Sequence, residues 1–390
     1  MIDLPELPPP SETLERPAIV SPAPRQVSFG VVAGRIGDGT TTVIVTVDGR
    51  PRASARVSGR RFRVEVPIPP RDVALRVIAV DFWGHRTVSR PVGPVFGLSA
   101  AATPRGTLGS ADPALGRTVR RLAREFPGTA AVYVQNLRTG EGAAWNAGAR
   151  FPAASTLKVA IALEVLRTLR GVPRPGTSVY RLLQSMLVHS SNQAANALEI
   201  WLGGSISGGA ARINATMAAL GLRDSHIFGG YAVSTGSHRP IPISVESQPA
   251  FGLGKYTTAW DLARLHRYLH LAAGGRGPPL RLAGSFTAAD ARFALYLLAH
   301  VRDPGKLERY VGGRAAVLHK AGWITYARHD AGLVYWSAGG IVAAVMTWKP
   351  SGAGVASDVL AGRVARTALR HFSQTAQARG RTSGTRPLRA

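Results

Sequence analysis

The period of the hydrophobic pattern changes near residue 100, and this change constrains the fold of the 390-residue chain more than any other feature. From Gln26 to about Leu98, short runs alternate between apolar and polar residues, a pattern that predicts half-buried strands. Beyond a stretch of small residues, longer runs with helical spacing alternate with strand-like runs. The sequence therefore predicts two domains, an all-β one followed by a mixed helix-and-strand one.

The N-terminal domain is expected to be a β-sandwich with room for roughly six or seven short strands. Its clearest strand-like runs are Val27–Val31, Thr42–Val47, Arg61–Val66 and Val73–Val80. Asp48-Gly49 is a hairpin signal that follows the second of these runs. The stretches Gly59–Pro69 and Val77–Val88 resemble the immunoglobulin-like modules of bacterial secreted and surface proteins. That resemblance implies a spacer or adhesion role.

Composition divides the chain into five segments. We expect a disordered Pro-rich lead at 1–25, the sandwich at 26–98, a small-residue linker at 99–111, the second domain at 112–372 and a basic disordered tail at 373–390. In the second domain, helical runs extend to Leu202 and from Thr258 to Ala272, and strand-like runs precede the final helix.

Ser155 and Lys158 lie three residues apart at the start of the apolar run Val159–Leu163. Residues three apart on a helix share a face, so the Lys158 amine can approach the Ser155 hydroxyl. A buried lysine with a lowered pKa can remove the hydroxyl proton and create a nucleophile. The alternative is an ordinary helix cap followed by a charged residue. The chain uses 43 arginines and only five lysines, which favours the catalytic interpretation, because arginine cannot serve as a base.

The formal net charge of +26 raises the question of an anionic partner. The arginines are scattered, without the aromatic interleaving of a single-strand binder, so the sequence disfavours nucleic acid. An anionic cell-envelope polymer or membrane surface remains a possible partner. The chain has no cysteine, which excludes disulfides and thiolate chemistry.

Two further motifs follow, Ser190-Ser191-Asn192 with Asn196, and Lys320-Ala321-Gly322 at the end of a strand-like run. Each alone is compatible with a loop or a turn. In order, Ser-x-x-Lys, Ser-x-Asn and Lys-x-Gly resemble the active-site elements of class A β-lactamases and penicillin-binding D,D-peptidases. The resemblance implies an α/β-α domain with an antiparallel sheet flanked by helices, behind the immunoglobulin-like sandwich. It implies no cofactor.

The resemblance also implies a role for each matching residue. Ser155 would be the acylated nucleophile, Lys158 its proton acceptor, directly or through a water, and Ser190 the proton donor to the leaving nitrogen. Asn192 would orient the substrate amide, and Lys320 would hold Ser190 and the substrate carboxylate in a cationic field. Gly322 would allow close approach, so that the N–H groups of Ser155 and Trp323 form an oxyanion hole.

Three departures from the family pattern bear on function. Ser191 replaces an aspartate, and Ala321 stands where a hydroxyl residue usually contacts the substrate carboxylate. The glutamate element that positions the deacylating water is missing, and Glu246 is the only acid between Asp224 and Asp261. Glu246 is expected either to be a solvated loop residue or to fold over the site as the base that hydrolyses the acyl-enzyme.

The remaining signals concern metal and location. His266 and His270 are four apart on a helical run, but no third ligand is evident, so no metal is expected. Residues 1–10 lack the basic and apolar regions of an export signal, and no run is long enough to span a membrane, whereas the resemblance implies an extracytoplasmic setting.

The leading hypothesis is a serine hydrolase of a β-lactam or related amide. The close alternative is a D-alanyl-D-alanine peptidase or esterase with the same site, acting on a peptidoglycan-derived substrate. The alternative of another class is a weakly active protein that binds an envelope polymer.

Overall fold

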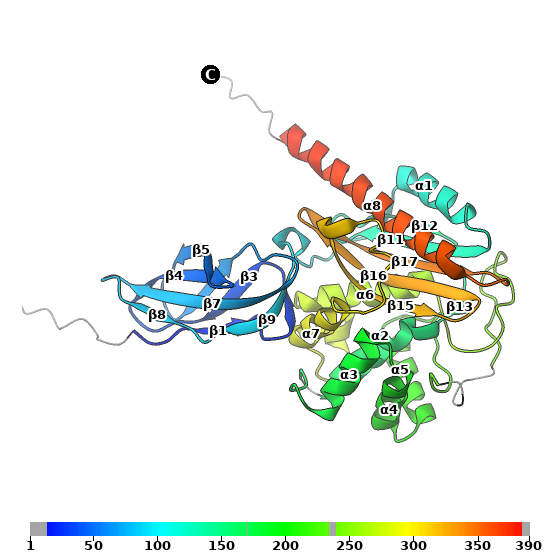
Figure 1. The fold of residues 1–390 in the computed structure, drawn as a ribbon, viewed down its shortest axis with the longest axis horizontal. Helices are drawn as coiled ribbons and strands as arrows, with labels where there is room; N and C mark the ends of the chain where they lie inside the picture. The colour runs from blue at the N-terminus through cyan, green and yellow to red at the C-terminus, as the bar shows by residue number, and fades with distance from the viewer. Residues whose placement is uncertain (1–13, 170, 233, 235–238, 384–390) are drawn as a thin grey trace, which may run out of the picture. The chain divides into compact units, whose positions relative to one another are not determined.

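The computed structural model describes residues 14–169, 171–232, 234 and 239–383. The chain divides into two compact units, Met1–Ala100 and Ala101–Ala390 (Figure 1). Each unit is described by itself below. In the described part of the chain, no helix combines the length and the apolar character needed to cross a membrane.

The first unit is a β-sandwich of two sheets. One sheet has the order β1 (Ala18–Ser21), β3 (Val31–Arg35), β6 (Arg61–Glu65). The other has the order β2 (Gln26–Ser28), β9 (Val92–Gly97), β7 (Asp72–Asp81), β4 (Thr40–Val47), β5 (Arg50–Arg56), and β8 (Arg86–Val88) pairs with β7. Buried aliphatic residues of both sheets, such as Val32 and Val64 from one and Val45 and Val77 from the other, form one core. The predicted sandwich is confirmed.

Details of this unit differ from the prediction in two places. The lead expected to be disordered at 1–25 contains a strand, because β1 pairs with β3; residues 1–13 lie outside the described part. The run Val27–Val31 is two strands rather than one, because the chain turns at Gly30, whose φ of +65° suits glycine. The hairpin at Asp48-Gly49 is confirmed, with φ values of +50° and +78° that fit a type I′ turn.

The second unit is built on a six-stranded sheet. Its order is β10 (Ser110–Ala111), β12 (Glu141–Trp145), β11 (Thr129–Asn136), β17 (Gly339–Trp348), β16 (Ala327–Trp336), β15 (Ala316–Trp323). Neighbouring strands are antiparallel except β10 and β12. The sheet confirms the expected α/β-α architecture.

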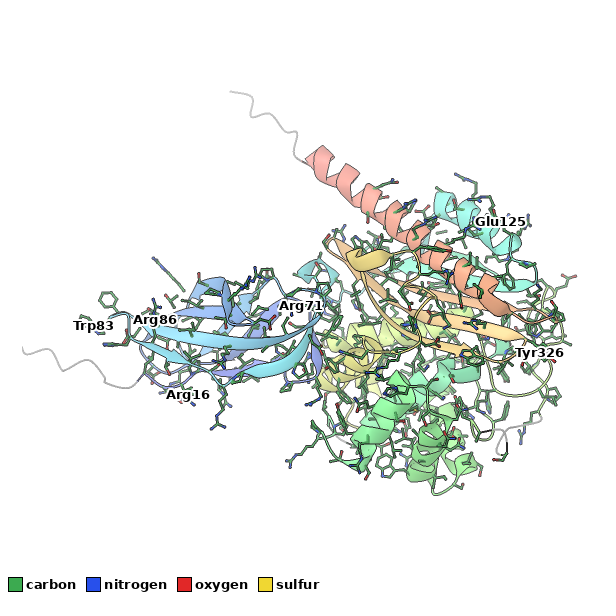
Figure 2. All side chains as sticks on the ribbon, viewed as in Figure 1. Arg16, Arg71, Trp83, Arg86, Glu125 and Tyr326 are labelled. Atoms are coloured by element: carbon green, nitrogen blue, oxygen red, sulfur yellow. The ribbon has the colours of Figure 1, made fainter. Side chains whose placement is uncertain are left out.

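Helices α1 (Pro113–Arg124) and α8 (Gly354–Ser383) cover one face of this sheet, where their apolar residues join a core with β11, β16 and β17 (Figure 1). Glu125, labelled in Figure 2, forms ion pairs with Arg121 of α1 and Arg363 of α8. Helix α8 continues beyond Phe372 to Ser383, so disorder does not begin at 373 as predicted. The Gln, Ala and Arg residues that follow Phe372 are good helix formers.

The other face carries α6 (Ala259–Ala273) and a helical layer of α2 (Lys158–Leu169), α3 (Ser178–Val188), α4 (Asn192–Gly203), α5 (Ile206–Ala219) and α7 (Ala288–Leu298) (Figure 1). A short two-stranded sheet, β13 (Phe151–Pro152) with β14 (Tyr256–Thr257), lies at the entry to α2. The edge strand β15 packs against the turn that precedes α2, so the sheet and the helical layer meet at Ser155.

Candidate active site

Ser155 lies in a 3₁₀ turn, η2 (Ala154–Leu157), and α2 begins at Lys158. The turn starts with a non-glycine residue in the left-handed region, Ala154 at φ +47°, a conformation that is found mostly where surrounding structure enforces it. Ser155 is half-buried, and the Lys158 side chain is completely buried. The sequence predicted both residues at the start of a helix, and the structure differs only in the tighter first turn.

The Lys158 ammonium reaches across to the second motif. Its Nζ donates to the carbonyl oxygen of Ser190 at 2.6 Å and to Oδ1 of Asn192 at 2.7 Å, and it lies 3.5 Å from the Ser190 hydroxyl. Two segments that are more than 30 residues apart in sequence therefore meet at one amine, and the Ser190-x-Asn192 motif faces the Ser155-x-x-Lys158 motif.

Burial, together with the positive charges of Lys320 and Lys255 and against the opposing effect of Glu199, lowers the pKa of Lys158 to about 7. An ordinary lysine is almost entirely protonated at neutral pH. Here a substantial share of the amine is neutral, so Lys158 can accept the proton of a neighbouring hydroxyl.

Lys320 approaches Ser190 from β15. Its buried Nζ donates to Ser190 Oγ at 3.0 Å and to the carbonyl oxygen of Ala321 at 2.9 Å. Burial lowers the pKa of Lys320 to about 8, although the carboxylates of Asp303 and Asp330 favour the ammonium. Lys320 thus stays mostly charged at pH 7, which suits a cationic partner for a carboxylate.

Gly322 allows β15 to approach the nucleophile turn closely. A Cβ atom at this position would lie 2.6 Å from the backbone nitrogen of Ser155 and 2.8 Å from that of Thr156. Trp323 follows at the end of the strand and is 60% exposed. The backbone of β15 and the Ser155 N–H therefore border the same space, as an oxyanion hole requires. The neighbouring Ala321 is buried and offers no hydroxyl.

Ser191 has a structural role at the start of α4. Its hydroxyl accepts a hydrogen bond from the Ala194 N–H at 3.1 Å and caps the helix. The serine that replaces the family's aspartate thus serves the helix, while Asn192 beside it contacts Lys158.

Glu246 is not part of this cluster, which corrects the prediction that it could fold over the site. The side chain is exposed, and its loop is anchored elsewhere: Ser244 donates to the Gly148 carbonyl at 2.7 Å and Ser247 to Asn146 at 3.0 Å. These contacts hold the loop against the end of β12, so Glu246 takes the solvated-loop alternative.

Three residues that the sequence did not single out complete the site. Tyr231 lies between two lysines, with Lys158 Nζ 4.9 Å and Lys255 Nζ 4.4 Å from its ring centre. The Tyr231 N–H donates to Asn196 Oδ1 at 2.6 Å. Glu199 is completely buried, and neither carboxylate oxygen has a hydrogen-bond partner among the described residues.

Two sequence signals could have found Lys255 and Glu199. Lysine is scarce in this chain, so Lys255, directly before β14, was a residue to single out for the same reason as Lys158. Glu199 is the one charged residue in the otherwise uncharged segment Asn192–Gly203, seven positions after Asn192 and so on the same helix face.

The histidines that the sequence suggested as metal ligands both lie on α6. His266 and His270 are buried in α6, and His270 Nδ1 lies 2.8 Å from the Tyr335 hydroxyl. A different set, Glu308, His319 and Asp330, brings potential metal-ligand atoms together in the described part of the chain. His319 Nδ1 lies 2.8 Å from both Asp330 oxygens, and although burial lowers the pKa of His319, Asp330 raises it above its usual range. This geometry fits a buried ion pair between His319 and Asp330, directly before Lys320 on β15.

Comparison with known proteins shows the family and the fold of the second unit. The model of the "Beta-lactamase enzyme family" matches residues 114–171 and 172–372. The solved structure of PBP-A is 22% identical over 68% of this chain and 98% of its own, with a TM-score of 0.54.

Two further solved structures are similar. A β-lactamase from Sphaerobacter thermophilus is 22% identical over 67% of this chain and 97% of its own, with a TM-score of 0.51. A mutant of PBP-A, solved as an acyl-enzyme complex with penicillin G, is 23% identical over 68% of this chain and 99% of its own, with a TM-score of 0.51. The comparison with curated proteins found no match.

Proposed function

Because the chain belongs to the β-lactamase enzyme family, we propose that it is a serine hydrolase that forms an acyl-enzyme on Ser155 with a β-lactam or a related amide. The observation that supports this most is the convergence of Lys158 and Lys320 on Ser190 beside the Ser155 turn. Acyl transfer needs a base for the hydroxyl, a proton for the leaving nitrogen and donors for the oxyanion. The cluster offers a residue for each.

In the acylation step, neutral Lys158 takes the proton of the Ser155 hydroxyl while Oγ bonds to the carbonyl carbon of the substrate. The developing oxyanion is stabilised by the Ser155 and Trp323 N–H groups, next to Gly322. The amide C–N bond then breaks, and the Ser190 hydroxyl delivers a proton to the leaving nitrogen. Ser190 recovers the proton that Lys158 took from Ser155, and Lys320 keeps its charge, so that the net transfer is one proton from Ser155 to the leaving nitrogen.

Two residues would bind the substrate. The Lys320 ammonium would pair with the substrate carboxylate, without help from a hydroxyl at Ala321. Asn192 would hold the side-chain amide, at the same time as it orients the Lys158 amine.

The hydrolysis of the acyl-enzyme separates a β-lactamase from the alternative, a D-alanyl-D-alanine peptidase or esterase. Fast hydrolysis requires a base that holds a water against the ester. The exposed position of Glu246 favours slow, peptidase-like turnover.

A fluorescent penicillin tests the function. We expect it to label the chain covalently, and the lifetime of the label distinguishes the two activities: rapid loss indicates a β-lactamase, and a persistent label indicates a peptidase. Absence of label from the wild-type chain, with every β-lactam tried, would refute the proposed acyl transfer. We also propose an extracytoplasmic setting, which cell fractionation would test.

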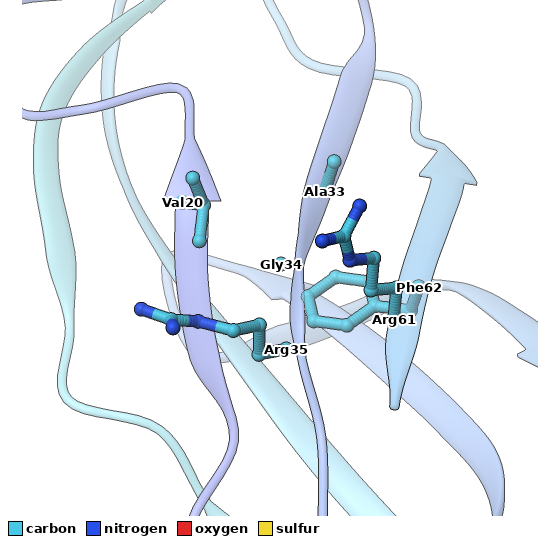
Figure 3. Close-up of a pocket in the computed structure, with 6 residues that line it drawn as sticks. All are labelled: Val20, Ala33, Gly34, Arg35, Arg61 and Phe62. Atoms are coloured by element: carbon cyan, nitrogen blue, oxygen red, sulfur yellow. The ribbon is translucent and has the colours of Figure 1, made fainter. Parts of the chain in front are cut away.

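A binding role is a second candidate, for the sandwich unit alone. An open hollow of about 420 Å³ lies on its three-stranded sheet, lined by the exposed side chains of Arg35, Arg61 and Val20 (Figure 3). Two guanidiniums beside an apolar surface suit an anionic envelope polymer. The double variant Arg35→Gln/Arg61→Gln should bind a polyglycerol-phosphate polymer more weakly, in the full chain, than the control double variant Arg86→Gln/Arg90→Gln does. An equal loss of binding in both double variants would show that only the net charge of the chain matters and that the hollow is not a binding site.

A further inference from the structure

We propose that Glu199 is a positioning residue of this active site. It is a carboxylate buried in α4 that controls how readily Lys158 gains and loses its proton. The inference rests on the proposed function, because it assigns Glu199 to the acylation step. Glu199 belongs to none of the three motifs. It lies on α4, whereas the acid that the sequence suggested, Glu246, lies in the loop before β14.

The position of Glu199 on α4 is the first observation. Asn192, Asn196 and Glu199 are spaced by four and then three residues, so they lie along one face of the helix. Asn192 contacts the Lys158 ammonium, and Asn196 contacts the Tyr231 backbone. Seven residues of helix rise about 10 Å, so Glu199 lies about two turns along α4 from Asn192, the residue that contacts Lys158. Glu199 therefore acts on the site through its charge and through Tyr231.

The burial of Glu199 is the second observation. Its side chain has no exposed surface, and neither oxygen finds a donor among the described residues. The Tyr231 hydroxyl is also buried, and it too has no hydrogen-bond partner among the described residues. A leucine here would avoid the cost of burying a carboxylate, which is large unless a charge partner compensates it.

Two lysines supply that compensation. The Lys255 ammonium donates to the Gly230 carbonyl at 2.5 Å and lies over the Tyr231 ring, whose other neighbour is Lys158. The charged groups that act on Lys158 are Lys320 from β15, Lys255 from the segment before β14, and Glu199 from α4. Of these three, Glu199 is the only acid.

Burial disfavours the charged form of both groups. It raises the pKa of Glu199 to about 7 against the effect of Lys255 and Lys158, and it is the largest cause that lowers the pKa of Lys158 to about 7. The neutral form of each group is therefore accessible near neutral pH. When Lys158 gives up a proton and Glu199 takes one, the amine becomes a base and the buried region gains no net charge.

Titration of the lysines tests this directly, because the chain contains only five. Protein labelled with ¹³C at the lysine Cε gives at most five side-chain signals, and the Lys158→Arg variant identifies the one from Lys158. In Glu199→Gln we expect the midpoint of that signal to fall by about one pH unit, since an acid that favours the ammonium has been removed. The matched control is Glu246→Gln, the same chemical change on an exposed loop, which should leave the midpoint unchanged.

In the Lys255→Met variant the titration midpoint of Lys158 should shift in the opposite direction. This measurement does not depend on how well Glu199→Gln folds. Removing this positive charge should raise the Lys158 midpoint. A Lys158 midpoint that is the same in Glu199→Gln as in the wild type, or that fails to rise in Lys255→Met, would overturn the proposal.

Activity gives the second readout. The rising limb of the penicillin-labelling rate against pH should move to lower pH in Glu199→Gln, together with the Lys158 midpoint. A uniform loss of rate with the limb in place would mean a merely structural role and would also overturn the proposal. The titration needs no substrate, so failure of the proposed function, seen as no label on the wild type, is distinguishable from failure of this inference.

Discussion

The Lys320 ammonium donates a hydrogen bond to the Ser190 hydroxyl at 3.0 Å. Lys158 approaches the same residue from α2 and holds its carbonyl oxygen at 2.6 Å. Ser190 has φ +58°, a left-handed conformation that costs a residue other than glycine roughly 1–2 kcal/mol. The two lysines hold Ser190 in this strained conformation, in which its hydroxyl can relay a proton between them and a substrate.

The acylation rate should depend on pH as a bell. Burial lowers the pKa of Lys158 to about 7 and that of Lys320 to about 8. The rate rises through about 7 as Lys158 becomes the neutral base, and it falls above about 8 as Lys320 loses the charge that binds the substrate carboxylate. Stopped-flow labelling with a penicillin across both values measures the two limbs. A rate that still rises well above pH 8 would show that Lys320 is not needed as an ammonium.

Gly322→Ala should abolish most of the acylation. The new Cβ would lie 2.6 Å from the Ser155 nitrogen, so β15 must move away from the nucleophile turn. Loss of one oxyanion-hole donor costs about 100-fold to 1,000-fold in rate. Gly116→Ala in α1, where a Cβ meets nothing within 4 Å, is the control and should acylate normally. Normal acylation in Gly322→Ala would show that the close approach of β15 to the Ser155 turn is not needed for the reaction.

Ser191→Ala should change stability rather than chemistry. The serine caps α4 through the Ala194 N–H, and loss of such a cap costs about 1 kcal/mol. Urea unfolding should show this loss, while Ser191→Asp, which can still cap the helix, should unfold near the wild type. A large drop in labelling rate with unchanged unfolding would assign Ser191 to the reaction.

The sequence was sufficient to predict the architecture. The change in hydrophobic period separated the sandwich from the second unit, whereas only the resemblance of the three motifs to a known family implied that Ser155, Lys158, Ser190 and Lys320 share one site. These signals are local, since each depends on residues within a few positions of one another.

Glu199, Tyr231 and Lys255 were missed because only packing brings them together. Glu199 sits seven positions beyond the second motif, and Tyr231 and Lys255 come from a loop and a strand start with no periodic pattern. For Glu246 the sequence left two alternatives, because composition could not show that Ser244 and Ser247 anchor its loop to Gly148 and Asn146.

Residues 1–100 should be dispensable for acylation. They form their own compact unit, and every residue of the proposed site lies in the other. A chain that starts at Ala101 should therefore be labelled by penicillin at the wild-type rate. If it folds, judged by its circular dichroism and cooperative unfolding, but is no longer labelled, the sandwich contributes to the site.

The identity of the acylated residue tests the central claim most directly. Intact-protein and peptide mass spectrometry after incubation with penicillin G should show one added penicilloyl group on the peptide that contains Ser155. The Ser155→Ala variant should carry none while retaining the wild-type free energy of unfolding to within about 1 kcal/mol. An adduct on another residue, or an undiminished adduct in Ser155→Ala, would contradict the proposed mechanism.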